Sequence, residues 1–294
     1  MPKLYLLAGA TASGKTAFSI DFARQHNCEI LSCDASCFYK GMDIGTAKPT
    51  HEEQGQVKHW GIDIIEPNAY FSVKDYINYA QKCIEAIVAR GHNVLVVGGS
   101  GFYLKSFLTP IADDVIIPQE IEQKISYLEE SGGLDFLVEQ LKIANPSEDL
   151  TIDLKNPRKV KKALGRCWAT GKTLRELEAE LEQHPLPFPH LDKETFLLQP
   201  PLEVLRLRIR QRARKMLDNG LLDEVKTLLD KKLLLPHTPA GFAIGYRETI
   251  QYLSGEISFE QLYEQIVQNT YALVKKQMTW FRYQIHFQHY LYTL

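Results

Sequence analysis

The feature that constrains this chain most is an eight-residue, glycine-containing segment near its N-terminus. Residues 9–16 read GATASGKT and match the pattern G-x-x-x-x-G-K-[ST] in full. The segment follows a short apolar run, residues 3–8, and precedes a helical pattern through Phe18, Ile20 and Phe22. Backbone amides in such a turn point at a phosphate, and the following helix N-terminus adds its positive dipole end. The segment therefore predicts a site for a diphosphate or a triphosphate.

Two residues of this loop have predicted roles of their own. Lys15 is expected to reach the terminal phosphate, and the Thr16 hydroxyl is expected to hold Mg²⁺. The chain has no Asn-Lys-x-Asp guanine signature, which disfavours a GTPase, whereas a small-molecule or nucleotide kinase stays open on the loop alone. The predicted diphosphate-binding residues are Gly9, Ala10, Thr11, Ala12, Ser13, Gly14, Lys15 and Thr16.

The hydrophobic pattern predicts the fold class. Residues 29–33, 92–97 and 195–198 are short apolar runs, and residues 73–90 carry apolar side chains at helical spacing. Strands that alternate with helices indicate a parallel sheet covered on both faces. We therefore expect an α/β fold, a parallel sheet like that of P-loop nucleotide hydrolases flanked by helices.

The character of the chain changes after Pro110. Residues 112–190 hold helical segments with many charges and end in a proline-rich connector, His184–His190. Beyond Pro201 the pattern is helical almost to the end. We predict a core made of residues 1–111 and 191–294, with residues 112–190 forming a helical insertion domain that contacts the partner.

Composition restricts the setting in which the protein works. The five cysteines are odd in number and form no C-x-x-C pair, which argues against a disulfide framework and a zinc site. The first apolar run is too short for a membrane span and lacks the features of a signal peptide. A cytoplasmic protein with no membrane partner, acting as a monomer, is expected.

The net charge of −2 announces no nucleic-acid partner, so any RNA-binding charge must be gathered locally. Residues 155–172 gather seven lysines and arginines without an acidic residue. Such a cluster suits the phosphates of an RNA stem-loop, although it is also compatible with a solvated helix face.

Two further segments should meet the phosphate loop at one edge of the sheet. Asp34 follows the strand at 29–33, and Gly98–Tyr103 ends the strand at 92–97. Ligands of open α/β sheets bind along the edge where parallel strands end. A carboxylate at this edge can hold Mg²⁺ through water or act as a base, or it can simply cap a helix. Ser100 can place a hydroxyl near the reacting atoms.

Several runs of the chain, taken together, resemble the bacterial tRNA dimethylallyltransferases. The resemblance spans nearly the whole chain, and its most specific run is GMDIGTAKP, because no general phosphate-binding fold requires it. The matching segments are Gly9–Thr16, Asp34–Pro49, His59–Asp63, Gly98–Tyr103, Asn156–Arg158 with Thr170–Lys172, Ala243–Arg247 and Lys275–Arg282.

The resemblance implies a reaction and a set of roles. Members of that family transfer a dimethylallyl group from dimethylallyl diphosphate to N6 of the adenine at position 37 of tRNA, with Mg²⁺. By resemblance the loop holds the diphosphate of the prenyl donor, Asp34 is the general base, and Arg208 and Arg212 face the diphosphate. Ser100 stands where the family usually has threonine and completes the predicted catalytic set. The expected partner is the tRNA anticodon stem-loop, contacted by Asp34, Ala35, Ser36, Cys37, Ser100, Arg158, Lys159, Val160, Lys161, Lys162, Gly245, Tyr246 and Arg247.

Some positions depart from the family pattern. The common D-S-x-Q-x-Y reads DASCFY at residues 34–39, so a hydroxyl and an amide are missing at Ala35 and Cys37. Three alternatives stay open on the residues: a P-loop kinase, a prenyltransferase that uses free adenine nucleotides, and a catalytically inactive RNA-binding relative. The kinase does not explain the run at 41–49, and the basic stretch at 155–172 favours tRNA over a free nucleotide.

Overall fold

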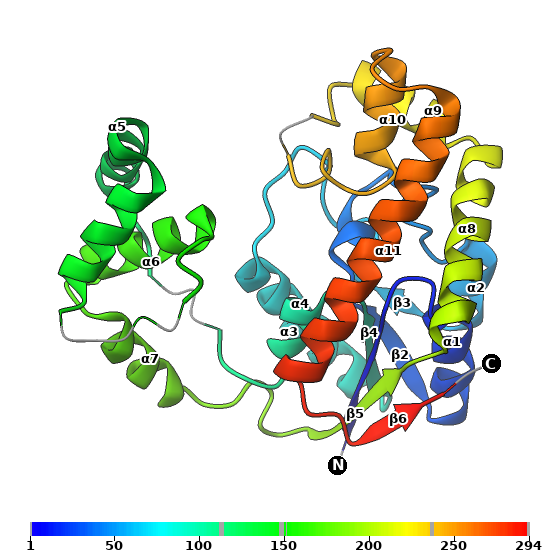
Figure 1. Cartoon of the computed structure of the whole chain (residues 1–294). Helices are drawn as coiled ribbons and strands as arrows, with labels where there is room; N and C mark the ends of the chain where they lie inside the picture. Colours follow the sequence, from blue (N-terminus) through cyan, green and yellow to red (C-terminus); the bar gives the residue numbers. More distant parts are fainter. Residues whose placement is uncertain (1, 112–114, 147–149, 151, 236–237, 293–294) are drawn as a thin grey trace. The chain divides into compact units, whose positions relative to one another are not determined.

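A parallel sheet forms the centre of the larger part of the chain (Figure 1). The computed structural model describes residues 2–111, 115–146, 150, 152–235 and 238–292. Its six strands follow the order β3-β2-β4-β1-β5-β6, and every paired neighbour is parallel. Their bounds are β1 Lys3–Gly9, β2 Cys28–Ser32, β3 His59–Trp60, β4 Asn93–Gly98, β5 Asp192–Leu198 and β6 His289–Leu291.

The predicted α/β fold with a parallel sheet is confirmed. The four strands expected from apolar runs are β1, β2, β4 and β5, each displaced by at most a few residues. Two short strands were not predicted. β3 has two residues and β6 has three, and such short edge strands carry no run of apolar residues that could reveal them.

Alternation along β1 explains how the sheet is covered. Leu4 and Leu6 pack into a cluster with α3, α4 and α11, whereas Tyr5 and Leu7 pack into a cluster with α1. Successive side chains of a strand point to opposite faces, so both faces of this central strand are buried. The helices of this unit are α1 Lys15–Gln25, the 3₁₀ helix η1 Ala35–Phe38, α2 His51–Gln56, α3 Val73–Ala89, α4 Gly101–Lys105, α8 Leu202–Asp218, α9 Leu221–Asp230, α10 Tyr246–Leu253 and α11 Phe259–Gln284.

Local signals set the starts of the long helices. Ser72 caps α3 and Ser258 caps α11, each accepting a hydrogen bond from a backbone N–H three residues later. Helices α8 and α11 lie side by side (Figure 1) and share a second core cluster with α9 and α10. This cluster includes Leu205, Ile209 and Val274, each at most 2 % exposed. The helices that carry several site residues are therefore fixed by a core of their own.

The chain divides into two compact units, Met1–Leu108 with Phe188–Leu294, and Thr109–Pro187. The second unit holds α5 Gln119–Ala144, α6 Pro157–Thr170 and α7 Leu174–Glu182. Gly133 interrupts α5 with a φ of 68°, and Asn156 caps α6, whose first residue is a proline. Leu137, Leu141 and Leu164 are fully buried where these helices pack together.

Two further properties concern the whole chain. Among the residues that the structure describes, no helix is long and apolar enough to cross a membrane. The five cysteines are all buried, and none of them is in a disulfide in the described structure.

Candidate active site

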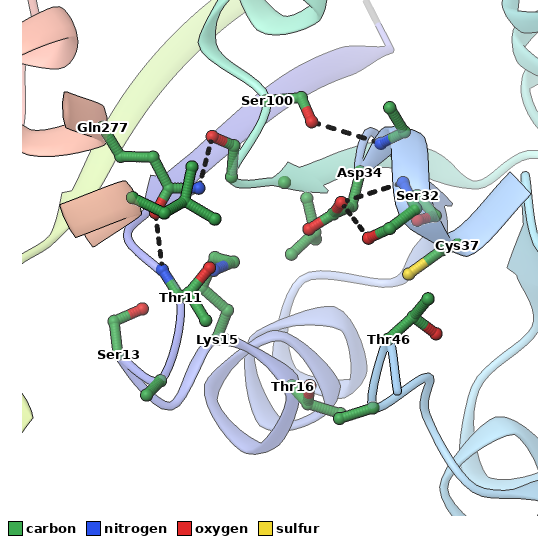
Figure 2. A pocket seen from close by; sticks show the side chains of 18 of the residues that line it. Thr11, Ser13, Lys15, Thr16, Ser32, Asp34, Cys37, Thr46, Ser100 and Gln277 are labelled. Atoms are coloured by element: carbon green, nitrogen blue, oxygen red, sulfur yellow. Dashed lines mark hydrogen bonds between the residues drawn. The ribbon is translucent and has the colours of Figure 1, made fainter. Parts of the chain in front are cut away.

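A cavity of about 1040 Å³ opens at the edge of the sheet where β1, β2 and β4 end. Its walls come from the loop after β1, the segments after β2 and β4, and helices α8 and α11. All of these elements belong to the first unit. Parallel strands end together at one edge, so residues distant in sequence meet there, as in other open α/β sheets. Figure 2 shows the side chains that line this cavity.

The glycine-containing loop after β1 forms the floor of the cavity. Gly14 adopts a left-handed φ of 92° and Ala12 has a φ of 65°, which turns the chain into the start of α1. The side-chain hydroxyl of Ser13 is buried and has no hydrogen-bond partner among the described residues. Of the eight predicted residues, Thr11 to Thr16 line the cavity, whereas Gly9 and Ala10 do not. The sharp turn brings Thr11 to Thr16 to the wall of the cavity and leaves Gly9 and Ala10 behind that wall.

Lys15 lies in this loop with its ammonium group folded onto the backbone. Its Nζ donates to the carbonyl oxygens of Gly9 at 2.8 Å and Ala10 at 2.9 Å. Burial lowers the pKa of Lys15 to about 8; the negative charge of Asp34 opposes this shift and the positive charge of Arg212 adds to it. A desolvated cation of this kind is strongly attracted to an anion that enters the cavity.

Asp34 faces the same cavity from the segment after β2 (Figure 2). Its Oδ1 accepts from the backbone N–H of Ser36 at 3.2 Å and from the Ser36 hydroxyl at 2.7 Å. Asp34 therefore caps η1, the structural role considered from the sequence. It also contributes charge to the pocket, because the pKa shifts of both Lys15 and Arg212 include its influence.

The turn between β4 and α4 brings Ser100 close to Asp34. The Ser100 Oγ accepts a hydrogen bond of 3.1 Å from the backbone N–H of Ala35, so its own proton is available to a ligand. A side chain at Gly98 would bring its Cβ within 2.0 Å of the Cys33 carbonyl oxygen. Only glycine therefore allows the ends of β2 and β4 to lie this close.

Two arginines of α8 reach the cavity from one flank of the helix, as their four-residue spacing predicts. Arg208 donates from Nη1 to the Ser13 carbonyl oxygen at 3.2 Å, and Arg212 donates from Nη2 to the Thr46 carbonyl oxygen at 2.8 Å. Burial lowers the pKa of Arg212, although the negative charge of Asp34 opposes this effect. The cavity thus combines the cationic side chains of Lys15, Arg208 and Arg212 with the carboxylate of Asp34, and Lys276 and Glu53 also line it.

The other arginines of α8 have surface partners. Arg206 donates to the Tyr271 hydroxyl, Arg210 pairs with Glu264 at 3.5 Å and Arg214 pairs with Asp218 at 3.4 Å. All three arginines are exposed, so this second flank of α8 is a solvated basic face.

The segment at 43–46, part of the run that carried the resemblance, forms another wall. Glu224 of α9 accepts from the backbone N–H groups of Asp43 at 2.9 Å, Ile44 at 2.8 Å and Gly45 at 3.2 Å. The Tyr246 hydroxyl donates to the same carboxylate. A Cβ at Gly45 would lie 2.4 Å from the Tyr246 ring, so glycine is required for this packing.

This arrangement gives a packing role to Tyr246, one of the three residues Gly245, Tyr246 and Arg247 that were predicted to contact tRNA. Tyr246 is fully buried, so its side chain supports the 43–46 segment and cannot touch an RNA. Arg247 donates to the buried carboxylate of Glu248 at 2.6 Å. None of the three lines the cavity. Packing accounts for Tyr246, whereas Arg247 is partly exposed and its tRNA contact stays a prediction.

Residues 35–37 complete the part of the cavity beside Asp34. Ala35, Ser36 and Cys37 all line it, in the region where the sequence placed them. Burial raises the pKa of Cys37 to about 12, so its thiol stays neutral and inert at physiological pH.

The predicted RNA contacts of the second unit lie on α6. Arg158, Lys159 and Lys162 are exposed, whereas Lys161 donates to Glu129 at 2.8 Å. Val160 is fully buried in the core of its unit. The prediction of an RNA contact for the Val160 side chain is therefore wrong, because that side chain packs between α6 and α5.

Sequence reasoning missed several residues that line the cavity. Gln277 and Trp280 come from α11, and Phe102 and Phe242 stand at 55 % and 57 % exposure on two other segments. Gln277 and Trp280 lie in the run Lys275–Arg282, and Phe102 lies in Gly98–Tyr103, so the resemblance marked these segments without giving the residues a role. Their placement in the cavity depends on how α11 and the segment before α10 pack against the sheet.

Within the described ranges, no cluster of three or more histidine, cysteine, aspartate or glutamate side chains is placed to hold a metal ion. The Thr16 hydroxyl lines the cavity beside Lys15. Magnesium commonly binds through one or two protein oxygens plus substrate phosphates and water. The residues present therefore fit an ion that arrives with a phosphorylated ligand.

The fold and the site define an α/β protein of the P-loop class, with a phosphate-binding loop and a carboxylate that share one cavity. Comparisons with known proteins specify the family. A sequence model described as IPP transferase matches residues 37–284. The chain is 45% identical over 285 residues to a tRNA dimethylallyltransferase of Opitutus terrae, covering 97% of this chain and 91% of that one. The chain belongs to the IPP transferase family.

Solved structures agree in fold. A full-length tRNA isopentenylpyrophosphate transferase from Bacillus halodurans matches with a TM-score of 0.70 and 31% identity, covering 100% of this chain and 90% of that one. A eukaryotic dimethylallyltransferase, described as acting on tRNA, matches with a TM-score of 0.82 and 23% identity, covering 98% of this chain and 74% of that one. The predicted family and fold are confirmed.

Proposed function

We propose that this protein transfers the dimethylallyl group of dimethylallyl diphosphate to N6 of the adenine at position 37 of tRNA. Similar proteins carry the name of this activity. The single observation that supports it best is that the phosphate loop and Asp34 face one cavity. The reaction needs a site that binds the diphosphate and a carboxylate that accepts a proton from the adenine amine.

The donor end of the cavity would bind the diphosphate. The backbone amides of residues 12–16, at the N-terminus of α1, would donate to the phosphate oxygens. Lys15 would exchange its carbonyl partners for phosphate oxygens as well. Arg208 and Arg212 line the same cavity, and Arg208 contacts the loop at the Ser13 carbonyl oxygen. As the allylic carbon–oxygen bond breaks, negative charge builds on the diphosphate, and these preorganised cations stabilise that charge.

Mg²⁺ is the proposed cofactor. The Thr16 hydroxyl would be its protein ligand, and the diphosphate oxygens and water would complete the coordination. When bound, the ion supplies further charge stabilisation to the leaving diphosphate.

The acceptor end of the cavity would hold the adenine. Its exocyclic amine is a weak nucleophile because the nitrogen lone pair is delocalised into the ring. One oxygen of Asp34 is held by Ser36, which leaves the other oxygen to orient the amine and take its proton. The Ser100 hydroxyl lies next to this carboxylate and can donate to the ligand. The base must leave its stack to enter the cavity.

The second unit would bind the anticodon stem-loop through its exposed basic residues. Arg158, Lys159 and Lys162 of α6 are the proposed phosphate contacts, because long cationic side chains on one helix suit an RNA backbone. We further propose that the protein works in the cytoplasm, where its tRNA substrate is found. We also propose that it acts as a monomer.

The test uses labelled dimethylallyl diphosphate with bulk tRNA or AMP as acceptor. We expect label in tRNA and none in AMP; label in AMP alone would show that the acceptor is a free nucleotide. Asp34→Ala should lower the rate of transfer by about 10²–10⁴-fold, the range that a general base contributes. Asp230→Ala, which removes an exposed carboxylate of α9, is the matched control and should leave transfer unchanged. An Asp34→Ala variant with wild-type turnover would refute the role of the base.

A further inference from the structure

One side chain of α11 joins the phosphate loop to the turn that carries Ser100. The Gln277 Oε1 accepts from the backbone N–H of Thr11 at 2.9 Å, and its Nε2 donates to the Gly99 carbonyl oxygen at 3.0 Å. Figure 2 shows both hydrogen bonds. A primary amide can accept from one backbone group and donate to another at once. Gln277 therefore ties the two loops together.

The packing around this bridge is tight. A Cβ at Gly99 would lie 2.7 Å from the Gln277 Nε2, and a Cβ at Gly101 would lie 2.2 Å from the Trp280 ring. Gln277 and Trp280 stand about one turn apart on α11, so the helix holds the 99–101 turn at two points. A side chain at Gly101 would collide with the Trp280 ring, and one at Gly99 would displace the amide of Gln277.

The bridge connects the two ends of the proposed reaction. Thr11 begins the part of the phosphate loop that lines the cavity, and Gly99 immediately precedes Ser100. Ser100 in turn accepts from the backbone N–H that follows Asp34. A continuous chain of contacts thus runs from the loop that would hold the diphosphate to the carboxylate that would hold the adenine.

From this geometry we infer that Gln277 is a positioning residue, which fixes the spacing between the donor loop and the acceptor side of the cavity. The inference rests on the proposed function. The Thr11 amide is already occupied by Gln277, so the diphosphate is bound by the later amides of the loop and by Lys15. Loss of Gln277 should therefore change the alignment of the two substrates more than the affinity for the donor. A misplacement of about 1 Å can lower a rate by about 10²-fold.

Three variants of the full chain test this role: Gln277→Ala, Gln277→Glu and, as a matched control, Gln268→Ala, which changes an exposed glutamine of the same helix. Turnover with tRNA gives kcat and KM for dimethylallyl diphosphate, calorimetry with inorganic pyrophosphate gives donor-site affinity, and a melting curve reports the fold. Gln277→Glu keeps an acceptor for the Thr11 N–H but loses the donor to Gly99. It preserves the side-chain volume if Gln277→Ala is too unstable.

We expect both Gln277 variants to lower kcat by about 10–100-fold, with pyrophosphate affinity and the KM for the donor close to wild type. Gln268→Ala should match wild type in every measurement. Wild-type kcat in both Gln277 variants would overturn the inference, and so would a loss that appears entirely in pyrophosphate affinity or in the melting temperature. A wild-type chain that binds pyrophosphate but does not modify tRNA would overturn the proposed function itself.

Discussion

Tyr246→Phe separates the structural role of this residue from the RNA contact that its sequence motif implied. The substitution removes only the hydroxyl that donates to Glu224. A hydrogen bond to a charged group contributes about 1.5–3 kcal/mol to stability. Glu224 keeps three backbone donors and is only partly buried. We therefore expect the lower part of this range, a loss of about 1.5–2 kcal/mol in the free energy of unfolding.

For a folded unit of this size, about 1 kcal/mol shifts the melting temperature by about 2–4 °C. Tyr246→Phe should thus lower Tm by about 3–8 °C in calorimetry, while the affinity for tRNA in a filter-binding assay stays close to wild type. Tyr283→Phe, which changes a tyrosine 72% exposed on α11, is the control and should leave Tm unchanged. A tenfold loss of tRNA affinity with an unchanged Tm would refute this account of Tyr246.

Two further predictions concern charge. Because burial lowers the pKa of Lys15 to about 8, and only the protonated form attracts the diphosphate, pyrophosphate affinity should be fully present below pH 8 and fall above it by up to about tenfold per pH unit. Lys15→Met is the control, because pyrophosphate itself also titrates. If pyrophosphate affinity falls with rising pH no more steeply in wild type than in this variant, the prediction is contradicted. Arg158→Ala and Lys159→Ala should each reduce the slope of log affinity for tRNA against log salt by about 1. Lys231→Ala, on the first unit, is the control, and unchanged slopes in the α6 variants would exclude these phosphate contacts.

The parts of the fold that follow from local patterns could be predicted from the sequence. The strand with Leu4 and Leu6 and the strand with Val94 and Val96 are buried on both faces, so their apolar runs are uninterrupted and easy to recognise. The edge strands β3 and β6 consist of two and three residues. They are ordered by their neighbours, and nothing in their own composition announces them.

The same distinction holds at the site. The phosphate loop and Asp34 have local signatures, because each stands at the end of a strand whose position could be inferred. Glu224 has none, and Gln277 lies in a run that resembles the family but does not reveal its role, since a glutamine or glutamate on an amphipathic helix is ordinary until the tertiary packing shows what it contacts. Resemblance to a family marked Val160 and Tyr246 as residues that matter, but burial shows that their side chains act through packing.

A structure of the protein with a slowly reacting thio-analogue of the donor, Mg²⁺ and an anticodon stem-loop would examine most directly whether two substrates meet in one cavity. The account predicts the diphosphate against residues 12–16, and the N6 atom of the extruded adenine within hydrogen-bond distance of the Asp34 oxygen that Ser36 leaves open. An adenine bound outside this cavity, or a diphosphate that does not contact Lys15, would contradict it.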